Sequence, residues 1–445
     1  MKLLVWKSLS ASGRHAALQR PAQKAQKRTA AIVAGILALV RRQGDRALRQ
    51  LTARLDGAKL SSLRVSAAEL AAAEQALRPA DRAALRRAYR NIRKFHLAQR
   101  PKPVRVETMR GLVCEKVSRP IERVGLYVPG GSAPLFSTAL MLGVPAQIAG
   151  APVRVLCTPP GRDGRVSPWI LVAARLCGIT EVFKLGGAQA IGAMAYGTAS
   201  VPKCDKLFGP GNSFVTEAKL QVSRDAAAID LPAGPSEVMV IADNSANPAF
   251  VAADLLSQAE HGPDSQVVLV AFSEKFAARV QAEIDAQLRQ LPRGAIATAA
   301  LQRSRILLAA SPAEAVEIAN RYAPEHLILQ VRNARALLAQ ITTSGSVFVG
   351  AWTPESLGDY ASGTNHVLPT YGWARACSGL GLADFMRTMT VQEATPLGLQ
   401  KLGPVVERLA LAENLAAHQR AVRVRLEALP VAAVYDRRKN ARRRS

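Results

Sequence analysis

The stretch that decides the fold begins at residue 124 and reads VGLYVPGG. From there the chain repeats one pattern, in which a short apolar run ends in glycine or proline and a helical stretch follows. The later runs are VRVLCTP (153–159), EVFKLGG (181–187), KLFGPGN (206–212), EVMVIAD (237–243), SQVVLVAF (265–272), RILLAA (305–310), HLILQV (326–331) and SVFVGA (346–351). Short apolar strands that alternate with helices are typical of a parallel α/β sheet. The series is long enough for two such sheets, and LPAGPSE at 231–237 marks the crossing between them.

The segments on either side of this series read as helical. Apolar residues recur at helical spacing over 32–40, an alanine-rich helical segment covers 67–97, and the strand pattern stops after 379. A chain of 445 residues is too long for one ordinary core. We therefore predict an α/β fold with two Rossmann-like parallel-sheet domains and helical extensions at both ends. The expected parts are an N-terminal extension (1–24), a discontinuous first α/β domain (25–123 with 238–378), a second α/β domain (124–237), a helical C-terminal domain (379–435) and a basic disordered tail (436–445).

The net charge of +26 lies mainly at the two ends of the chain. Residues 1–100 hold 22 basic and 5 acidic residues, and 436–445 hold 6 and 1, so 101–435 keep 31 and 27. The middle, where the strand runs lie, is therefore nearly neutral. Basic ends can bind polyanions weakly, but no nucleic-acid-binding module accompanies them. A nucleic-acid-binding or scaffold protein is the less favoured alternative.

The sequence also bears on compartment and thiol chemistry. The longest uncharged apolar run near the start, 29–40, is too short to cross a membrane, and the first residues lack the features of a secretory signal. We expect a cytoplasmic protein. The five cysteines, Cys114, Cys157, Cys177, Cys204 and Cys377, show no CxxC spacing, so neither a disulfide framework nor a thiolate zinc site is predicted. None lies in a convincing nucleophile motif, which disfavours thiol catalysis of the aldehyde dehydrogenase kind.

Three glycine-rich loops follow predicted strands. They are VPGGS (128–132), GGAQA (186–190) and GPGN (209–212). Glycine lets backbone amides approach a phosphate closely, and the helix that follows offers its positive N-terminus to an anion. The standard dinucleotide fingerprint GxGxxG is absent after these strands. The loops are either tight turns or a cofactor site of another kind.

Four of the six histidines lie between residues 261 and 418, each with an acid or amide nearby. The pairs are Gln258 with His261, Glu325 with His326, Asp359 with His366, and Glu413 with His418. These groups suit a divalent metal and a proton-transfer step. Gln258 and His261 share the last turn of one predicted helix, and Glu325 and His326 enter an apolar strand. The pairs point to an enzyme, although any one of them alone could be an ordinary surface pair.

Seven blocks stand in order from residue 124 onward and form a specific set. They read VGLYVPGGSAPLFST, KLGGAQAI, FGPGNSFVTEAK, DLPAGPSEVMVIAD, LLSQAEHGPDS, YAPEHL and PESLGDYASGTNHVLPT. As a set they resemble the L-histidinol dehydrogenase family. The resemblance implies oxidation of L-histidinol to L-histidine through an aldehyde, in two hydride transfers to NAD, as the last step of histidine biosynthesis. It also implies one zinc ion per subunit in a homodimer with shared active sites.

The resemblance assigns roles to individual residues. It implies that zinc is held by Gln258, His261, Asp359 and His418, and that His418 comes from the other subunit through an exchanged C-terminal domain. His326 would accept the alcohol proton, and Glu325 would activate water for attack on the aldehyde. The implied substrate contacts are Ser236, Gln258, His261, His326, Asp359, Glu413 and His418, and the implied NAD contacts are Tyr127, Gln189 and Asn212. His366 receives no role.

The chain departs from the family pattern in two places. The segment 212–236 is a couple of residues shorter than usual, and Glu413-Asn-Leu stands where the family typically has Glu-Gly-Leu. A relative that oxidises another amino or polyol alcohol with the same groups is the nearer alternative. Glu413 discriminates between the two, because a carboxylate suits a cationic substrate.

Overall fold

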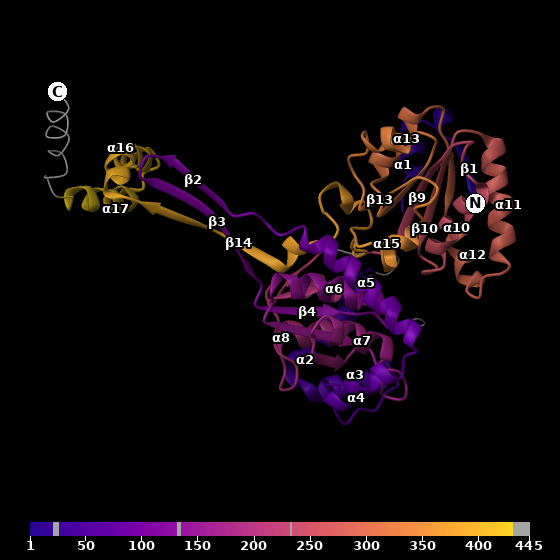
Figure 1. Ribbon diagram of the computed structural model, residues 1–445, viewed down its shortest axis with the longest axis horizontal. Coiled ribbons are helices and arrows are strands. Elements are labelled where there is room, and N and C mark those ends of the chain that lie inside the picture. The colour runs from indigo at the N-terminus through magenta and orange to yellow at the C-terminus, as the bar shows by residue number, and fades with distance from the viewer. Residues whose placement is uncertain (21–25, 131–134, 232–233, 430–445) are drawn as a thin grey trace. The chain divides into compact units, whose positions relative to one another are not determined.

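The computed structural model describes residues 1–20, 26–130, 135–231 and 234–429, and it divides into two units (Figure 1). The first unit comprises Met1–Arg100 with Pro120–Phe385, and the second comprises Pro101–Arg119 with the chain from Met386 onward. Five expected features lie wholly or partly outside the described residues. They are the end of the N-terminal extension (1–24), the end of the VPGGS loop, the middle of LPAGPSE, the end of the C-terminal domain (379–435) and the basic tail at 436–445.

The first unit contains a five-stranded parallel sheet that includes the first four predicted runs. Its strands are β4 (Arg123–Tyr127), β5 (Val153–Thr158), β6 (Glu181–Lys184), β7 (Lys206–Phe208) and β8 (Ala228–Ile229), in the order β6-β5-β4-β7-β8. The connecting helices are α6 (Phe136–Ala149), α7 (Pro168–Leu176), α8 (Gly187–Tyr196) and α9 (Ser213–Val222). The chain leaves β4 for β5 on one side and returns to β7 on the other. A topological switch point, where open α/β sheets bind ligands, therefore lies between β4 and β7.

The five later runs form a six-stranded parallel sheet, also in the first unit. Its strands are β1 (Lys2–Val5), β9 (Glu237–Ala242), β10 (Gln266–Ala271), β11 (Arg305–Leu308), β12 (His326–Gln330) and β13 (Ser346–Val349), in the order β1-β11-β10-β9-β12-β13. Its helices are α10 (Pro248–Ala259), α11 (Glu274–Leu288), α12 (Gly294–Gln302), α13 (Pro312–Tyr322), α14 (Ala334–Leu338) and α15 (Glu355–Tyr360). β9, β10 and β12 are buried at every position because helices cover both faces of the sheet. All nine apolar runs are thus strands, as predicted.

The N-terminal hundred residues are helical, as expected, except at the very start. The helices are α1 (Ala11–Ala17), α2 (Gln26–Gln43), α3 (Asp45–Leu55), α4 (Ala67–Gln75) and α5 (Pro79–Leu97), with a 3-10 turn at Trp6–Ser8. Lys2–Val5, however, is strand β1, which pairs in parallel with β11. Its side chains are mostly exposed, as befits an edge strand, so the sequence showed no buried apolar run there. The first residues therefore complete the six-stranded sheet instead of forming a separate extension.

The structure also corrects the expected grouping of segment 25–123 with 238–378. Val33 and Leu37 of α2 share a hydrophobic cluster with Tyr127 and Val155 of the five-stranded sheet. Leu85 of α5 lies in the neighbouring cluster, which is built around α6. Helices α2 to α5 therefore belong to the five-stranded sheet. An amphipathic helix shows in its sequence that one face is buried, but not which sheet buries it.

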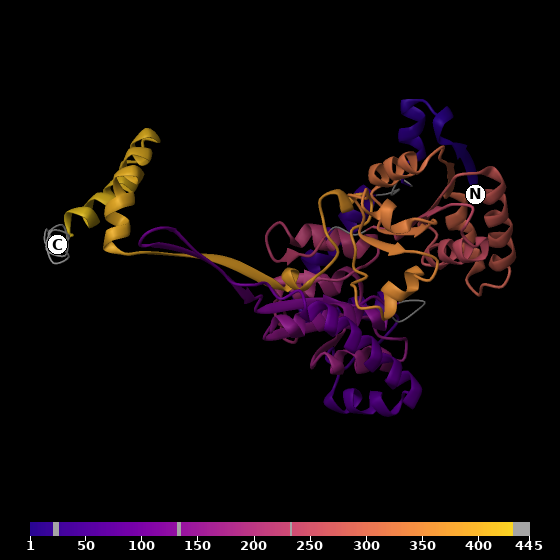
Figure 2. The ribbon, with the colours of Figure 1, turned by 45° about the horizontal axis from the view of Figure 1, so that its top comes forward.

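The second unit is not wholly helical, which corrects the expectation for 379–435. It contains β2 (Val104–Met109), β3 (Leu112–Pro120) and β14 (Met386–Ala394), in the sheet order β14-β3-β2 with β2 and β3 antiparallel. Helices α16 (Pro396–Ala412) and α17 (Ala416–Glu427) follow β14 as a hairpin, seen in yellow in Figure 2. β14 is exposed at eight of its nine positions. It therefore lacks the buried apolar pattern by which the nine runs of the two parallel sheets were predicted.

The bend between α16 and α17 accounts for one departure from the family pattern. Asn414 has a φ of 59°, in the left-handed region. Glycine adopts that conformation most easily, and asparagine is among the few other residues that tolerate it. Asparagine can therefore replace the usual glycine after Glu413 without changing the bend.

The remaining short elements are 3-10 turns at Trp373–Arg375 and Leu382–Phe385. Within the described ranges, no helix combines the length and the apolar character that crossing a membrane requires.

Candidate active site

Two catalytic candidates lie where the chain enters the middle of the six-stranded sheet. Helix α13 ends at Tyr322, its C-cap Ala323 has a left-handed φ of 53°, and Pro324, which cannot continue the helix, follows. Glu325 and His326 follow at once, and His326 is the first residue of β12. Both side chains are buried, with 5% and 4% of their surface exposed. The proline after the helix end thus places two adjacent titratable groups at the start of a buried strand.

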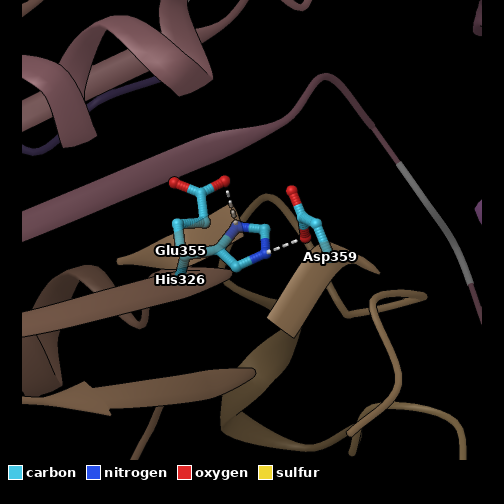
Figure 3. Close-up of side chains that lie close together, drawn as sticks. All are labelled: His326, Glu355 and Asp359. Carbon is cyan, nitrogen blue, oxygen red and sulfur yellow. Dashed lines mark ion pairs between the residues drawn. The ribbon is translucent and has the colours of Figure 1, made fainter. Parts of the chain in front are cut away.

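His326 lies among three carboxylates, of which Figure 3 shows two. Its Nδ1 is 3.7 Å from Glu325 Oε2 and 3.6 Å from Glu355 Oε1, and its Nε2 is 3.7 Å from Asp359 Oδ1. Nδ1 also lies 3.3 Å from the Glu237 carbonyl oxygen. This contact is a hydrogen bond when Nδ1 carries the proton. In that tautomer Nε2 keeps its lone pair, and none of the described residues hydrogen-bonds to it.

Glu355 is the site residue that the sequence did not indicate. Glu355 and Asp359 are four residues apart on α15, so they share one face of that helix. Together with His326 they form a group of potential metal ligands within 4.8 Å of one another. The four-residue spacing was visible in PESLGDY, but it is common on solvated helices. Only the structure shows that Glu355 is 1% exposed.

Burial and mutual repulsion shift the pKa values of these groups. Burial raises the pKa of Glu325 to about 8, although His326 and the Glu237 N–H favour the carboxylate. Burial also raises the pKa of Glu355 well above its ordinary value. For His326 burial works the other way, but the carboxylates of Glu355, Glu325 and Asp359 outweigh it and raise the pKa to about 10. The cluster therefore retains protons at neutral pH.

Gln258 and His261 approach the same cluster from α10. Gln258 is buried, and its carboxamide, oriented to satisfy both of its ends, donates to Glu355 and accepts from the Glu237 N–H at 3.2 Å. The helix ends at Ala259, so His261 lies just beyond it and not in its last turn, and its side chain is exposed. Its Nδ1 is 3.0 Å from the Ser257 carbonyl oxygen. With the proton on Nδ1, the Nε2 of His261 is free to bind a metal.

Asp359 connects these groups electrostatically. Burial alone would raise its pKa, but His326 and the imidazoles of His366 and His261 hold the pKa below its ordinary value. His366 also contacts the backbone of Asp359. Its Nδ1 lies 2.9 Å from the Asp359 carbonyl oxygen, and its Nε2 lies 3.1 Å from Thr138 Oγ1 of α6. His366, for which the sequence implied no role, therefore helps to hold Asp359 in position.

The donor set fits a divalent cation of the zinc type. Three carboxyl groups gather around the single imidazole of His326, and so much buried acid is costly unless a positive charge offsets it. The amide oxygen of Gln258, a free nitrogen of His261 and the carboxylate of Asp359 are ligand types that zinc accepts. Among the residues implied as ligands, these three belong to the first unit.

The remaining residues that the resemblance implied for zinc and substrate lie in other segments of the chain. Ser236 is half-buried directly before β9, and its carbonyl accepts from the Gln266 N–H at 3.2 Å. Glu413 follows the last residue of α16, and His418 lies in α17. Both side chains are exposed in the second unit.

The three residues implied as NAD contacts lie at the carboxyl ends of the five-stranded sheet. Tyr127 ends β4, Gln189 lies in the first turn of α8, and Asn212 caps α9 by accepting from the Phe214 and Val215 N–H groups. The Tyr127 hydroxyl accepts from the Gly187 N–H at 3.0 Å. A Cβ on Gly209 would lie 2.1 Å from the Tyr127 carbonyl oxygen, so this loop needs glycine to pass close to β4.

Two features of these loops suit a ligand at this edge of the sheet. The loops after β4 and β7 flank the topological switch point. Gln189 Oε1 is buried and has no hydrogen-bond partner among the described residues, as expected for an atom that awaits a ligand. Gln189 Nε2 donates to Asp56 at 3.3 Å, and burial raises the pKa of that carboxyl to about 6.

Comparison with known proteins gives a consistent result. The profile of the histidinol dehydrogenase family matches residues 18–426. A histidinol dehydrogenase of Xanthomonas campestris pv. campestris (strain 8004) is 59% identical over 427 residues, covering 96% of this chain and 99% of the relative. One of Xylella fastidiosa is 56% identical and covers 97% and 100%. The crystal structure of histidinol dehydrogenase from Elizabethkingia anophelis superposes with a TM-score of 0.92 at 47% identity, covering 96% and 98%.

Proposed function

Because this chain belongs to the histidinol dehydrogenase family and is thus an oxidoreductase of histidine biosynthesis, we propose that it oxidises L-histidinol to L-histidine through L-histidinaldehyde. The four-electron reaction would reduce two NAD at a site with one zinc ion per subunit. The observation that carries the proposal is the burial of two proton-transfer groups, Glu325 and His326, beside the carboxylate of Asp359. A dehydrogenase that works twice on one carbon needs both a base for the alcohol and a group that activates water.

His326 is the base of the first step. Its Nδ1–H donates to the Glu237 carbonyl, which fixes the ring and leaves the lone pair of Nε2 free. Nε2 accepts the proton of the substrate hydroxyl as the carbinol carbon loses hydride. The surrounding carboxylates favour the protonated ring, and a bound divalent cation would counter their negative potential and return the pKa of His326 towards neutrality.

Glu325 serves the aldehyde step. Its Oε2 accepts from the Glu237 N–H at 2.9 Å, so Oε1 remains available to water. Oε1 takes a proton as the water oxygen bonds to the aldehyde carbon, and His326, protonated in the first step, returns its proton from Nε2 to the carbonyl oxygen. The hydrate then loses the second hydride while Nε2 of His326, neutral again, accepts the hydroxyl proton. Since both bases contact the backbone of one residue, Glu237, they keep the same position relative to each other in both oxidations.

The other residues bind and orient the reactants. When bound, zinc supplies a positive anchor for the substrate nitrogens, and NAD accepts the hydrides. Gln258, His261, Asp359 and His418 of the partner subunit would hold the zinc. Ser236 and Glu413 would contact the substrate, and Tyr127, Gln189 and Asn212 would contact NAD.

A homodimer with an exchanged C-terminal domain is supported by the second unit itself. Its helix α16 exposes Val405, Leu409 and Leu411, each more than half accessible. Exposed apolar side chains on one helix suit a contact with another chain. Exchange of this unit between two copies would cover it and would bring Glu413 and His418 to the partner's site.

A substrate panel tests the proposed function. NADH formation is measured with L-histidinol, with L-leucinol, which has the amino alcohol but no imidazole, and with glycerol. We expect kcat/KM for L-histidinol to exceed the others by at least about 100-fold, because a site built to bind a polar group rejects analogues that lack it. Equal or faster oxidation of L-leucinol or glycerol would favour the relative that acts on another alcohol.

The pH dependence of the aldehyde step follows from the raised pKa of Glu325. The carboxylate, and not the acid, activates water, so kcat/KM for L-histidinaldehyde should rise with pH below the raised pKa of Glu325 and level off above it. The Glu325→Gln variant should lose this rise. A Glu325→Gln variant that keeps the rise of the wild-type profile would show that Glu325 is not the base.

A further inference from the structure

Arg20 lies outside the catalytic cluster but makes four hydrogen bonds to residues next to it in the chain or in space. Its Nε donates to Glu237 Oε2 at 2.5 Å, and its Nη2 donates to Glu237 Oε1 at 2.7 Å. The same Nη2 donates to the carbonyl oxygens of Tyr322 and Ala323, at 2.8 and 3.2 Å. The side chains of Arg20 and Glu237 are 11% and 1% exposed. The two residues thus form a buried bidentate ion pair, and Arg20 also binds the end of α13.

Tyr322 lies beside the same ion pair. Its hydroxyl donates to Gln266 Oε1 at 2.8 Å and lies 3.3 Å from Glu237 Oε2. The Arg20 guanidinium stacks over the Tyr322 ring, 4.0 Å from its centroid. Tyr322 therefore packs against the ion pair, and the two charged side chains have little freedom.

The backbone of Glu237 is what the two bases contact. Its N–H donates to Glu325 Oε2 at 2.9 Å, and its carbonyl oxygen lies 3.3 Å from His326 Nδ1. Arg20 also binds the carbonyl oxygens of Tyr322 and Ala323, the two residues before Pro324 and Glu325. One guanidinium thus links the start of β9 with the end of α13, from which the chain runs through Pro324 to the two bases.

We infer that Arg20 and Glu237 are positioning residues for the catalytic pair. They act by setting where Glu325 and His326 lie. The inference rests on the proposed function for the chemistry that it supports. Only arginine suits this place, because its planar fork binds both carboxylate oxygens and still reaches the two carbonyls, whereas lysine offers a single point charge.

The test uses Arg20→Lys, Arg20→Met, Glu237→Gln and the double variant Arg20→Met/Glu237→Gln in the zinc-loaded enzyme. Arg321→Met is the matched control, since Arg321 lies at the end of α13 and pairs with Glu317 on the surface. For each protein, kcat and KM for L-histidinol, zinc content and Tm are measured. Arg20→Lys keeps the buried charge, so it separates loss of position from loss of stability.

We expect the three single variants at Arg20 and Glu237 to lose about 10- to 100-fold in kcat, with KM and zinc content near wild type. Arg20→Lys should keep most of the Tm but not the kcat. The double variant should be no slower than the slower single one, because both substitutions break the same interaction. The control should keep wild-type kcat.

The inference is overturned if Arg20→Lys has wild-type kcat, if the losses at Arg20 and Glu237 multiply in the double variant, or if loss of kcat simply follows loss of zinc. A wild-type enzyme that fails to oxidise L-histidinol contradicts the proposed function instead. The two failures are therefore distinguishable.

Discussion

Replacing His326 by glutamine is expected to lower kcat about 10²- to 10⁴-fold for both L-histidinol and L-histidinaldehyde. The imidazole Nε2 is the proton acceptor in each oxidation, and glutamine has no group that titrates near neutrality. Glutamine can still donate to the Glu237 carbonyl that Nδ1 contacts, so the strand should keep its place. The two half-reactions are measured separately by NADH formation, with zinc content determined on the same samples.

Glu325→Gln is the matched comparison at the neighbouring position. Because Glu325 activates water, its loss should slow the aldehyde step strongly and the alcohol step by no more than about tenfold. Equal losses at both steps in Glu325→Gln, or a loss at only one step in His326→Gln, would contradict the division of roles. If either variant merely lost zinc, its effect would belong to metal binding and not to proton transfer.

Removal of zinc is expected to lower activity by at least about 100-fold, and added Zn²⁺ should restore it. Without the cation, the three carboxyl groups around His326 keep the imidazole protonated, and the ring cannot accept a proton. Dialysis against a chelator, followed by stepwise addition of Zn²⁺, measures the loss and the recovery in one preparation. Asp359→Ala should be equally inactive and should not recover.

Glu355→Gln is the control that tells whether zinc is held by the proposed ligands, which include Asp359, or by a set that includes Glu355. Glu355 lies within the group of potential ligands around His326, but it is not among the residues proposed to hold zinc. The variant should therefore keep its zinc while Asp359→Ala loses it. Loss of zinc in Glu355→Gln and retention in Asp359→Ala would show that the metal is held by a different set of side chains.

The fold could be predicted where strands are buried on both faces. Each of the nine apolar runs is a strand, and the signal is strongest in β9, β10 and β12, which are buried at every position, because a parallel strand under helices on both sides needs apolar side chains throughout. The edge strand β1 and the exposed strand β14 escaped prediction because they bury little. Burial leaves a pattern in sequence, whereas pairing between backbones does not.

The candidate site divides in the same way. Glu325, His326 and Asp359 were identified through blocks of sequence that resemble the family, and the structure brings these three together. Glu355 was missed because only the packing of α15 buries it. Arg20 was missed because its charge looked like part of a basic N-terminus, while its role depends on Glu237, far along the chain. Interactions of this kind are fixed by tertiary packing and leave no local signal.

The central claim is that one site oxidises the same carbon twice, and the yield of NADH per L-histidinol tests it most directly. A limiting, known amount of L-histidinol is converted to completion by the zinc-loaded enzyme with excess NAD, and NADH and L-histidine are quantified together. The account predicts two NADH and one L-histidine for each L-histidinol consumed. One NADH with accumulation of the aldehyde would contradict it.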